Sequence, residues 1–458
     1  MTQPSALVIP AGIHAGLKAH LFPGDGCEAA AILLCSRSPG ARKRLLAQRL
    51  ISVPHGDCAI RTPDYISWPG RYLEEAIDRG EGEGLSVVLV HSHPGGLFAF
   101  SHVDDESDAV TVRALHAAYE ADHGSAIMMP SGAIRARTYL DGIATDFDLV
   151  IIPGDDILTF WVDRDQNQRA PVAFTSEMTA QNDRLSVLVI GASGTGSPTI
   201  EQLLRLGFGR VVGVEYDLTE FKNLNRILNA TIADAETEMP KVQVMLRAAE
   251  SHRGQGVFVP VERSIFDREA VLAGADCDFI LCCVDTLEAR YVADLMGSAF
   301  LMPVIDMGVV VPTRQAPART VIADVCGRID YVYPGGSTLA DRGVYTPEAL
   351  EAEYLRLHAP DVHREKVKEG YIKGMAEEAP SVISLNMRAS AAAVNELLAR
   401  LYPFRHEHNS GYARTFFSLA AAEEDYTAEG KFKRGDEVEL ATGAREPLLG
   451  LPALGAER

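Results

Sequence analysis

Two histidines and an aspartate in the N-terminal half of the chain have the residue types and spacing of a metal site. The segment begins with His91-Ser-His93 and continues to Ser101 and Asp104. Side chains two residues apart on a strand point to the same face, so His91 and His93 can offer two nitrogens to one metal. With Asp104 as third ligand, one coordination position stays open for water, as a catalytic zinc requires. Zinc lowers the pKa of that water toward neutrality and so generates hydroxide.

A purely structural interpretation of the same residues stays open. A lone pair of histidines is often part of the fold, and Ser101 followed by Asp104 is also the pattern of a helix N-terminus with an acidic third residue. Both roles are compatible in one turn. Glu28 opens the apolar run Ala29 to Leu34, and a buried carboxylate is costly unless it has a partner or a task. Its presence favours the metal site.

The spacing of these residues resembles the JAMM (JAB/MPN) metalloprotease family. The pattern is HxH, seven residues, Ser, two residues and Asp, with a separate upstream Glu. The resemblance implies that His91, His93 and Asp104 are zinc ligands, that Glu28 is the general base, and that Ser101 donates to the oxyanion of a tetrahedral intermediate. It also implies hydrolysis of amide or isopeptide bonds after the C-terminal glycine of a ubiquitin-like protein.

A glycine-rich turn in the C-terminal half is the second feature whose residue types could support a chemical function. Residues 185–190 are a predicted strand, the turn Gly191-Ala-Ser-Gly194-Thr-Gly196 follows, and an apolar stripe then predicts a helix. Backbone amides and the helix dipole at such a turn can bind phosphate. No lysine follows Gly196, so this is not a Walker A loop, and the turn alone does not decide between NAD and ATP. Glu215, at the end of the next strand, suits a ribose hydroxyl in either case.

Charged and amide side chains after the turn favour ATP. They are Asp217, Asn223, Arg226, Lys241 and Asp285. A hydride-transfer site does not need cations and a further aspartate around the phosphates. An ATP-consuming site uses cations to stabilise the charge on the reacting triphosphate and an aspartate to hold Mg²⁺. Arg226 or Lys241 taken singly is explained equally well as a solvated surface charge.

As a group, these residues resemble the ThiF/MoeB and ubiquitin-activating enzyme superfamily, across about residues 185–400. The resemblance implies that Glu215 binds the ribose, that Asn223, Arg226 and Lys241 contact the phosphates, and that Asp285 holds Mg²⁺. The implied reaction is adenylation: the C-terminal carboxylate of a ubiquitin-like protein attacks the α-phosphate of ATP and pyrophosphate leaves. It also implies a homodimer and a conjugating enzyme as partner.

One expected feature of that superfamily is missing here, and a second has only candidate residues. Many relatives have a Pro-Gly-x-x-Cys-Leu-x-Cys segment, whereas this chain has Thr338 and Asp341 at the two cysteine positions. The zinc that such cysteines bind is therefore not expected. An arginine that reaches the ATP of the partner subunit is expected before residue 185, and Arg169 and Arg184 are candidates.

The missing cysteines leave the fate of the acyl group open. In one alternative the enzyme stops at the acyl-adenylate or uses another cysteine, such as Cys326. In the other, Ser337 or Thr338 accepts the acyl group as an oxyester, which requires an activating base because an alcohol is a poor nucleophile at neutral pH.

These residues must be positioned by two α/β domains. Strands and helices alternate after residue 185, which predicts a Rossmann-like, doubly wound sheet. We expect a JAMM-type α/β metallopeptidase domain over residues 1–152, a linker over 153–184, a ThiF-like adenylation domain over 185–403 and a C-terminal tail over 404–458. A length of 458 residues agrees with two or three domains.

Composition limits the partners and the compartment. The chain has 43 Lys and Arg against 63 Asp and Glu, a net charge of −20, which argues against a nucleic-acid surface. Its 7 cysteines include no CxxC pair, so a disulfide framework is excluded and a reducing compartment is favoured. We find neither a targeting segment nor a long apolar run, and expect a cytoplasmic protein without a membrane partner.

The two motifs together predict a bifunctional enzyme of a bacterial ubiquitin-like conjugation system. ATP and Mg²⁺ would serve activation, and Zn²⁺ would serve a peptidase that matures the ubiquitin-like protein or removes it from targets. One alternative is activation and processing of a sulfur-carrier protein through a thiocarboxylate. Another is a scaffold whose N-terminal domain binds without cutting.

Overall fold

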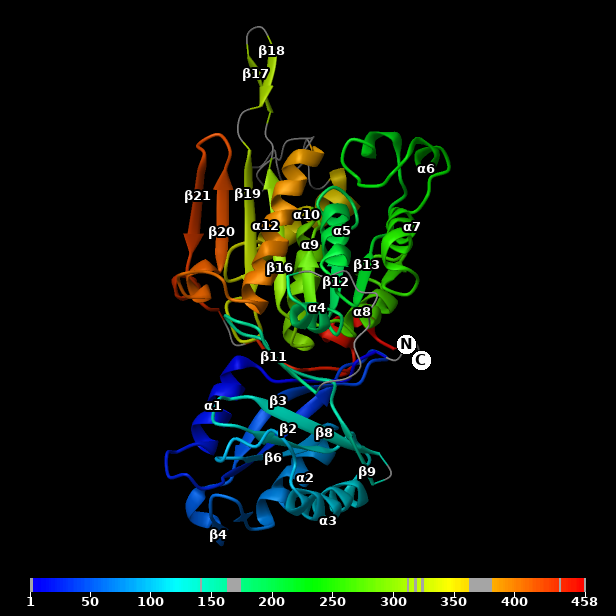
Figure 1. Cartoon of the computed structure of the whole chain (residues 1–458). Coiled ribbons are helices and arrows are strands. Elements are labelled where there is room, and N and C mark those ends of the chain that lie inside the picture. Colours follow the sequence, from blue (N-terminus) through cyan, green and yellow to red (C-terminus); the bar gives the residue numbers. More distant parts are fainter. Residues whose placement is uncertain are drawn as a thin grey trace. The chain divides into compact units, whose positions relative to one another are not determined.

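The computed structural model describes residues 3–140, 142–162, 174–310, 313–316, 319–322, 325–361, 381–435 and 438–456. The chain forms two compact units (Figure 1). Unit 1 contains residues 1–165 together with 298–301 and 438–448, and unit 2 contains 166–297, 302–437 and 449–458. The candidate Arg169 lies outside the described residues.

Unit 1 is built on a mixed sheet, which has nine strands among the described residues. In sheet order the strands are β11 (Leu158–Trp161), β10 (Leu149–Ile152), β1 (Ala6–Val8), β3 (Arg44–Ser52), β2 (Ala30–Arg37), β6 (Ser86–Ser92), β7 (Gly124–Met128), β8 (Ile134–Leu140) and β9 (Ile143–Asp146). A separate hairpin pairs β4 (Ile60–Arg61) with β5 (Ile66–Ser67).

Helices cover both faces of this sheet, because β2 is apolar on both sides. Leu33 packs in one core cluster with Leu17 and Leu21 of α1 (Ala11–Leu21). Its neighbour Ile32 packs in a second cluster with residues of α2 (Arg71–Glu83) and α3 (His102–Ala118). The uninterrupted apolar run of β2 therefore follows from a central strand buried on both faces.

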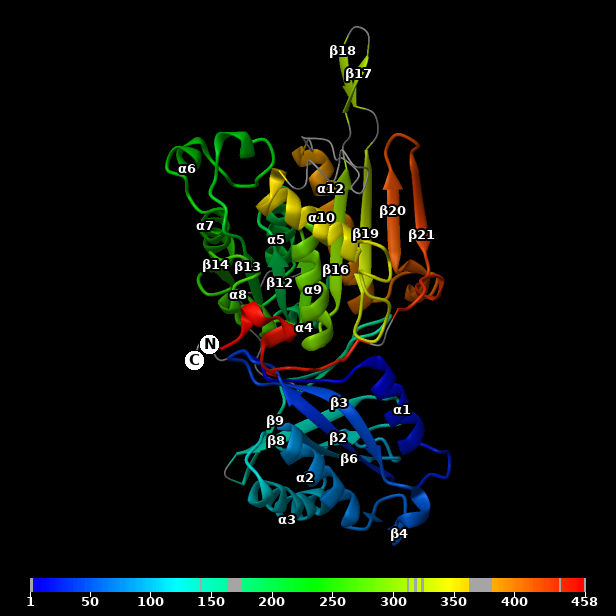
Figure 2. The ribbon, with the colours of Figure 1, turned by 180° about the vertical axis from the view of Figure 1, so that it is seen from behind.

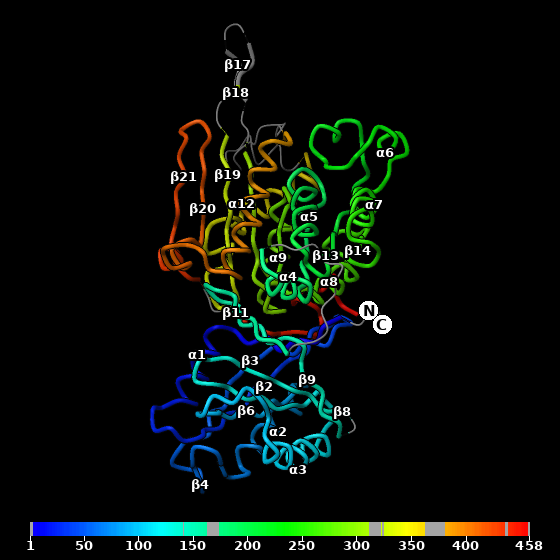
Figure 3. The backbone as a smooth tube through the Cα atoms, viewed as in Figure 1, coloured from blue at the N-terminus to red at the C-terminus, as the bar shows by residue number. Residues whose placement is uncertain are grey.

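Unit 2 contains a sheet with eight strands in the described part of the chain. In order these are β14 (Phe258–Val261), β13 (Arg210–Val214), β12 (Ser186–Ile190), β15 (Phe279–Cys282), β16 (Val304–Val310), β19 (Cys326–Val332), β20 (Arg414–Ser418) and β21 (Glu423–Thr427). The first five are parallel, and β19 to β21 continue antiparallel, as Figure 3 traces. A hairpin of β17 (Thr313–Ala316) and β18 (Arg319–Ile322) stands apart from this sheet.

Strand order places a switch point at β12 in unit 2. From β12 the chain adds β13 and β14 on one side and later β15 and β16 on the other. Ligands of open α/β sheets bind beyond the carboxyl ends of the strands at such a point. The turn that begins at Gly191 follows β12, and Asp285 follows β15, so both lie at this edge.

The helices of unit 2 also cover two faces, as a comparison of Figures 1 and 2 shows. On one face lie α5 (Gly196–Arg205), α7 (Lys241–Arg253) and α12 (Ile383–Leu401); on the other lie α8 (Arg268–Ala275), α9 (Leu287–Ala299) and α10 (Pro347–His358). Shorter elements of unit 2 are α4 (Ser176–Asn182), α6 (Ile232–Glu236) and the 3₁₀ turns η2 (Phe221–Asn223), η3 (Asn409–Tyr412), η4 (Glu429–Lys431) and η6 (Pro452–Leu454). The turn η1 (His55–Asp57) belongs to unit 1, and η5 (Leu448–Gly450) begins at its last residue.

Residues after 403 take part in both units. β20 and β21 extend the sheet of unit 2, whereas residues 438–448 belong to unit 1. There the Ser36 hydroxyl of β2 donates to the carbonyl of Ala441 at 2.6 Å. Across the described residues, no helix combines the length and apolar character needed to cross a membrane.

Candidate metal and nucleotide sites

The pairing of β2 with β6 brings Glu28 to the two histidines. Ala30 is paired with His91, and the Ala29 amide donates to the Ser92 hydroxyl at 2.9 Å. Continuing this antiparallel register places Glu28 opposite His93. Glu28 is buried, at 7% exposure, in this protected position. The predicted base and the predicted ligands therefore share one end of two neighbouring strands.

The donor atoms of the predicted ligands converge. The Nε2 atoms of His91 and His93 are 3.0 Å apart. The Asp104 carboxylate lies 3.0 Å from Nε2 of His91 and 3.4 Å from Nε2 of His93. Tetrahedral zinc with bonds near 2.1 Å separates its ligands by roughly 3.4 Å. This donor set fits zinc, and a carboxylate oxygen of Glu28 lies within 4.8 Å of both histidine ligand atoms.

A backbone carbonyl orients one of the rings. Nδ1 of His93 lies 2.9 Å from the carbonyl oxygen of Leu97. Because that carbonyl can only accept, Nδ1 carries a proton, and Nε2 is the ring nitrogen that faces the cluster and would bind a metal. Such an outer hydrogen bond is the usual way in which proteins fix a histidine as a metal ligand.

Ser101 and Asp104 also form the helix cap that the sequence allowed. The Ser101 hydroxyl accepts from the Asp104 amide at 3.2 Å, and the Asp104 carboxylate accepts from the Ser101 amide at 2.6 Å. These two bonds are a complete capping box at the start of α3. Capping and convergence on the histidines thus occur in the same turn.

Burial and charge perturb the acids of this cluster in opposite directions. Desolvation raises the pKa of Glu28 above its ordinary value, and the nearby histidines offset this only partly. Burial also raises the pKa of Asp104, but hydrogen bonds from His91 and His93 dominate and hold it far below its usual range. Glu28 is therefore the better proton acceptor of the two carboxylates, and Asp104 the permanent anion.

Close backbone packing explains the glycines of the second site. Gly191 has φ +92°, and a Cβ there would lie 2.9 Å from the carbonyl oxygen of Cys283. A Cβ on Gly196 would overlap the carbonyl oxygen of Gly191. The turn consequently folds tightly against the end of β15 and begins α5 at the switch point. A helix N-terminus in this position can bind phosphate.

Three carboxylates gather beside this turn. Glu215 accepts from the amides of Ala192, Tyr216 and Asp217 at 3.3, 3.0 and 3.1 Å, which ties the end of β13 to the glycine turn. Partial burial raises the pKa of Tyr216, and the charges of Asp217, Glu215 and Asp285 raise it further. The acids predicted to bind ribose and magnesium, Glu215 and Asp285, thus both lie near enough to Tyr216 for their charges to act on it.

The predicted cations lie on neighbouring segments. Lys241, at the start of α7, is 4% exposed, and its Nζ donates to the Asp217 carboxylate at 2.6 Å. Arg226 donates to the carbonyl of Lys222 at 3.1 Å and to the side chain of Asn225 at 3.2 Å. The buried Asn223 accepts from the Glu220 amide at 3.0 Å and so caps η2.

Asn386 and Ser381 reach the glycine turn although no local sequence pattern indicates it. The amide nitrogen of Asn386 occupies the space beside the Cα of Gly194, where a Cβ would have to lie. Asn386 also donates to the Ser381 hydroxyl at 2.9 Å, and Asn225 donates to the Ser381 carbonyl at 3.0 Å. These contacts come from the start of α12, far along the chain, and only the tertiary fold reveals them.

The loop with the altered cysteine positions is held by a buried network. Ser337 is fully buried; its hydroxyl donates to Glu429 at 3.0 Å and accepts from Arg342 at 2.9 Å. Thr338 is half-buried, and its hydroxyl accepts from the Asp341 amide at 3.0 Å. Cys326, in β19, is half-buried.

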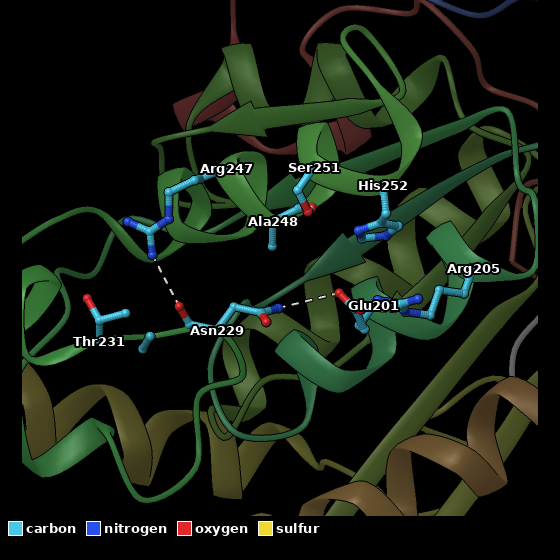
Figure 4. A pocket seen from close by; sticks show the side chains of 9 residues that line it. Glu201, Arg205, Asn229, Thr231, Arg247, Ala248, Ser251 and His252 are labelled. Atoms are coloured by element: carbon cyan, nitrogen blue, oxygen red, sulfur yellow. Dashed lines mark hydrogen bonds and ion pairs between the residues drawn. The ribbon is translucent and has the colours of Figure 1, made fainter.

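A hollow of about 480 Å³ lies on unit 2, between α5, α7 and the segment before α6. Figure 4 shows the side chains that line it. Its lining is Glu201, Arg205, Asn229, Ala230, Thr231, Arg247, Ala248, Ser251 and His252. Arg247 donates to the carbonyl of Asn229 at 3.1 Å, and Asn229 donates to Glu201 at 3.4 Å. None of the site residues predicted from the sequence lines this hollow.

Family models match both units. Residues 10–138 match the model of prokaryotic homologs of the JAB domain, and residues 166–313 match that of the ThiF family. The chain is therefore an α/β protein in which a JAB-like domain precedes a Rossmann-like ThiF domain.

The curated relatives match part of the second unit. Ubiquitin-like modifier-activating enzyme 5 of Dictyostelium discoideum is 31% identical over 120 residues, which cover 23% of this chain and 30% of that protein. The enzyme of the same name from Bombyx mori is 26% identical over 165 residues, 33% of this chain and 38% of that protein. The chain thus spans about a third of the length of these relatives.

Similar solved structures include E. coli MccB with ATP, at 13% identity and a TM-score of 0.41, covering 55% of this chain and 66% of that one. SeMet PaaA has 16% identity and a TM-score of 0.37, covering 55% of this chain and 75% of its own. Scores of this size do not assign a fold by themselves.

Proposed function

We propose that this protein activates the C-terminal glycine of a ubiquitin-like protein with ATP and hydrolyses bonds at that same terminus with zinc. The observation that carries the proposal is the presence of a JAB domain and a ThiF domain in one chain. It is supported in unit 1 by the close approach of Glu28 and Asp104 to the two histidines, and in unit 2 by the position of the glycine turn and Asp285 at the carboxyl edge of the sheet. The curated relatives, named as activating enzymes of ubiquitin-like modifiers, support the first activity.

In the adenylation reaction, the residues of unit 2 would bind ATP and stabilise charge. The amides at the start of α5 would bind phosphate, Glu215 the ribose and Asp285 the Mg²⁺ ion. As the carboxylate attacks the α-phosphate, the bond to pyrophosphate breaks and negative charge accumulates there. Lys241 and Arg226 would stabilise that charge. The Lys241 ammonium, now paired with Asp217, is already desolvated, which strengthens its interaction with phosphate.

In the peptidase reaction, the residues of unit 1 would manage a proton and an oxyanion. When bound, zinc supplies Lewis acidity and an acidified water. Glu28 would take a proton from the attacking water and later transfer it to the leaving amine. The Ser101 hydroxyl would donate to the oxyanion. His91, His93 and Asp104 would hold the metal.

The fate of the acyl group is proposed from the loop contacts. The Ser337 hydroxyl is buried and bonded on both sides, so transfer to it would require the loop to open. We therefore propose that the reaction stops at the acyl-adenylate. Thr338 and the half-buried Cys326 are the alternative acceptors of the acyl group. Release of the adduct by reducing agent would identify a cysteine, whereas release by hydroxylamine alone would identify an oxyester.

The wider setting is likewise proposed: a cytoplasmic homodimer in a bacterial conjugation system, which passes the activated protein to a conjugating enzyme. ATP–pyrophosphate exchange tests the adenylation activity. The substrate is a ubiquitin-like protein that ends in glycine and is encoded by a gene close to the gene of this protein. Exchange that depends on this substrate supports activation. Conversion of the substrate to a thiocarboxylate in the presence of a sulfur donor would instead favour sulfur-carrier activation.

A further inference from the structure

Two arginines of β8 anchor the segment that connects His93 to Asp104. This segment contains Gly95 and Gly96, so its own backbone gives it little rigidity. Arg135 donates to the carbonyl of Phe98 at 3.3 Å. The guanidinium carbon of Arg137 lies 3.7 Å from the centroid of the Phe100 ring, a cation–π contact. Phe100 is the residue directly before Ser101.

Arg137 also binds the far side of the same turn. Its NH1 donates to the carboxylate of Asp105 at 2.5 Å, and Asp105 directly follows Asp104. Its NH2 and Nε donate to Asp108, one turn further along α3, at 2.7 and 3.1 Å. One guanidinium therefore contacts the residue before Ser101, the residue after Asp104 and the next turn of the helix.

Burial and further hydrogen bonds hold the contacts between Arg137 and Asp108 in place. Arg137 is 6% exposed and Asp108 7% exposed. The Asp108 carboxylate also accepts from the Tyr139 hydroxyl at 2.7 Å and from the Ser125 hydroxyl. A buried charge pair held by several further hydrogen bonds has little freedom to move. Lysine could keep the charge but not the planar fork that serves Phe100, Asp105 and Asp108 together.

We propose that Arg137 is the positioning residue of the metal site. It fixes the turn from Ser101 to Asp104 so that the Asp104 carboxylate meets the imidazoles of His91 and His93. Arg137 itself binds neither metal nor substrate. The inference rests on the proposed zinc site. It deepens that proposal, because outer contacts of this kind decide how tightly a site holds its metal.

Zinc affinity of the full chain, measured by competition with a chromophoric chelator, tests this role. We expect Arg137→Lys and Asp105→Asn to bind zinc about 10- to 100-fold more weakly than the unmodified chain. The Asp105 side chain is 59% exposed, so its substitution leaves the core intact. Arg49→Lys is the matched control: Arg49 of β3 also pairs with a carboxylate, Glu83, through bonds of 2.6 and 2.8 Å, and its variant should retain full affinity.

The outcomes separate this inference from the proposed function. Zinc affinities of Arg137→Lys and Asp105→Asn within twofold of the unmodified chain would overturn the positioning role, as would an equal loss in Arg49→Lys. His91→Ala and His93→Ala report on the site itself. If they bind zinc as tightly as the unmodified chain, or if that chain binds none, the proposed zinc site is wrong and this inference falls with it.

Discussion

At the residue scale, the position of Glu28 beside the histidines follows from strand register. The sequence indicated an acid at the start of a buried run, but spacing alone cannot tell which strand that run pairs with. The pairing of Ala30 with His91 supplies the missing information. Local patterns predicted the pair His91 and His93 because both lie on one strand, whereas the contact with Glu28 crosses more than 60 residues.

We predict that Glu28→Gln slows hydrolysis strongly while zinc stays bound. The amide keeps the size of the side chain but cannot accept a proton from the attacking water. The expected loss in kcat is about 10²- to 10⁴-fold, the usual contribution of a general base. Cleavage of a ubiquitin-like protein with a C-terminal peptide extension measures it, and metal content is the control. A fully active Glu28→Gln chain would assign the base elsewhere.

A second prediction at this scale concerns the glycine turn. Gly196→Ala should lose ATP binding, because the new methyl group would overlap the carbonyl oxygen of Gly191 and push the turn away from β15. Gly411→Ala is the control in the same unit, because beyond its chain neighbours no atom lies within 4 Å of the added methyl group. Calorimetric titration with ATP and Mg²⁺ compares the variants. Unchanged ATP affinity in Gly196→Ala would place the nucleotide away from this turn.

At the element scale, a buried network around Arg342 holds the loop after β19 in which Thr338 and Asp341 stand at the expected cysteine positions. The Arg342 side chain is fully buried. It donates to Ser337, Glu429, Asp330 and the carbonyls of Tyr331 and Ala413. The sequence predicted the absence of a zinc-binding pair but not this network, since Glu429 lies 92 residues beyond Ser337. Polar residues of a long-range network have no periodicity that a sequence could reveal.

This network should stabilise unit 2. Removal of Arg342 leaves Asp330 and Glu429 as buried charges with fewer partners, so Arg342→Ala should lower the free energy of unfolding by about 3–5 kcal/mol. Chemical denaturation measures the loss. Arg263→Ala breaks the exposed pair with Glu269 and should leave the unfolding midpoint unchanged. Equal midpoints for the two variants would show that the buried network has no stabilising role.

A buried histidine between α3 and β7 predicts a pH dependence of unit 1. His123 is fully buried, and desolvation lowers its pKa to about 4 although its contact with the Tyr119 carbonyl acts in the opposite direction. Its Nδ1 accepts from the Val87 amide. The unfolded chain takes up this proton near pH 6.5, so stability is full above that pH and falls as the pH decreases toward 4.

The corresponding measurement is denaturation of the full chain at pH 7 and pH 5. Between pH 7 and pH 5, the free energy of unfolding of unit 1 should fall by on the order of 1 kcal/mol more in the unmodified chain than in a His123→Asn variant. The asparagine side-chain oxygen can still accept from the Val87 amide. The same loss in both proteins would assign the pH dependence to other groups.

At the scale of the whole molecule, two units were expected from chain length and from the two groups of motifs. The sequence did not predict that the residues after 403 are divided between the two units. Sequence patterns report short-range periodicity, and they predicted β12, the glycine turn and the helix α5. They could not reveal that β20 joins β19 in the sheet of unit 2, or that residues 438–448 contact β2, because such pairings depend on distant partners.

The central claim is that one chain carries two separable activities on one terminus. The decisive measurement compares Asp285→Ala and His91→Ala in ATP–pyrophosphate exchange and in cleavage of the extended ubiquitin-like substrate. We predict that Asp285→Ala loses exchange and keeps cleavage, while His91→Ala loses cleavage and keeps exchange. Full exchange in Asp285→Ala, or full cleavage in His91→Ala, would contradict the account.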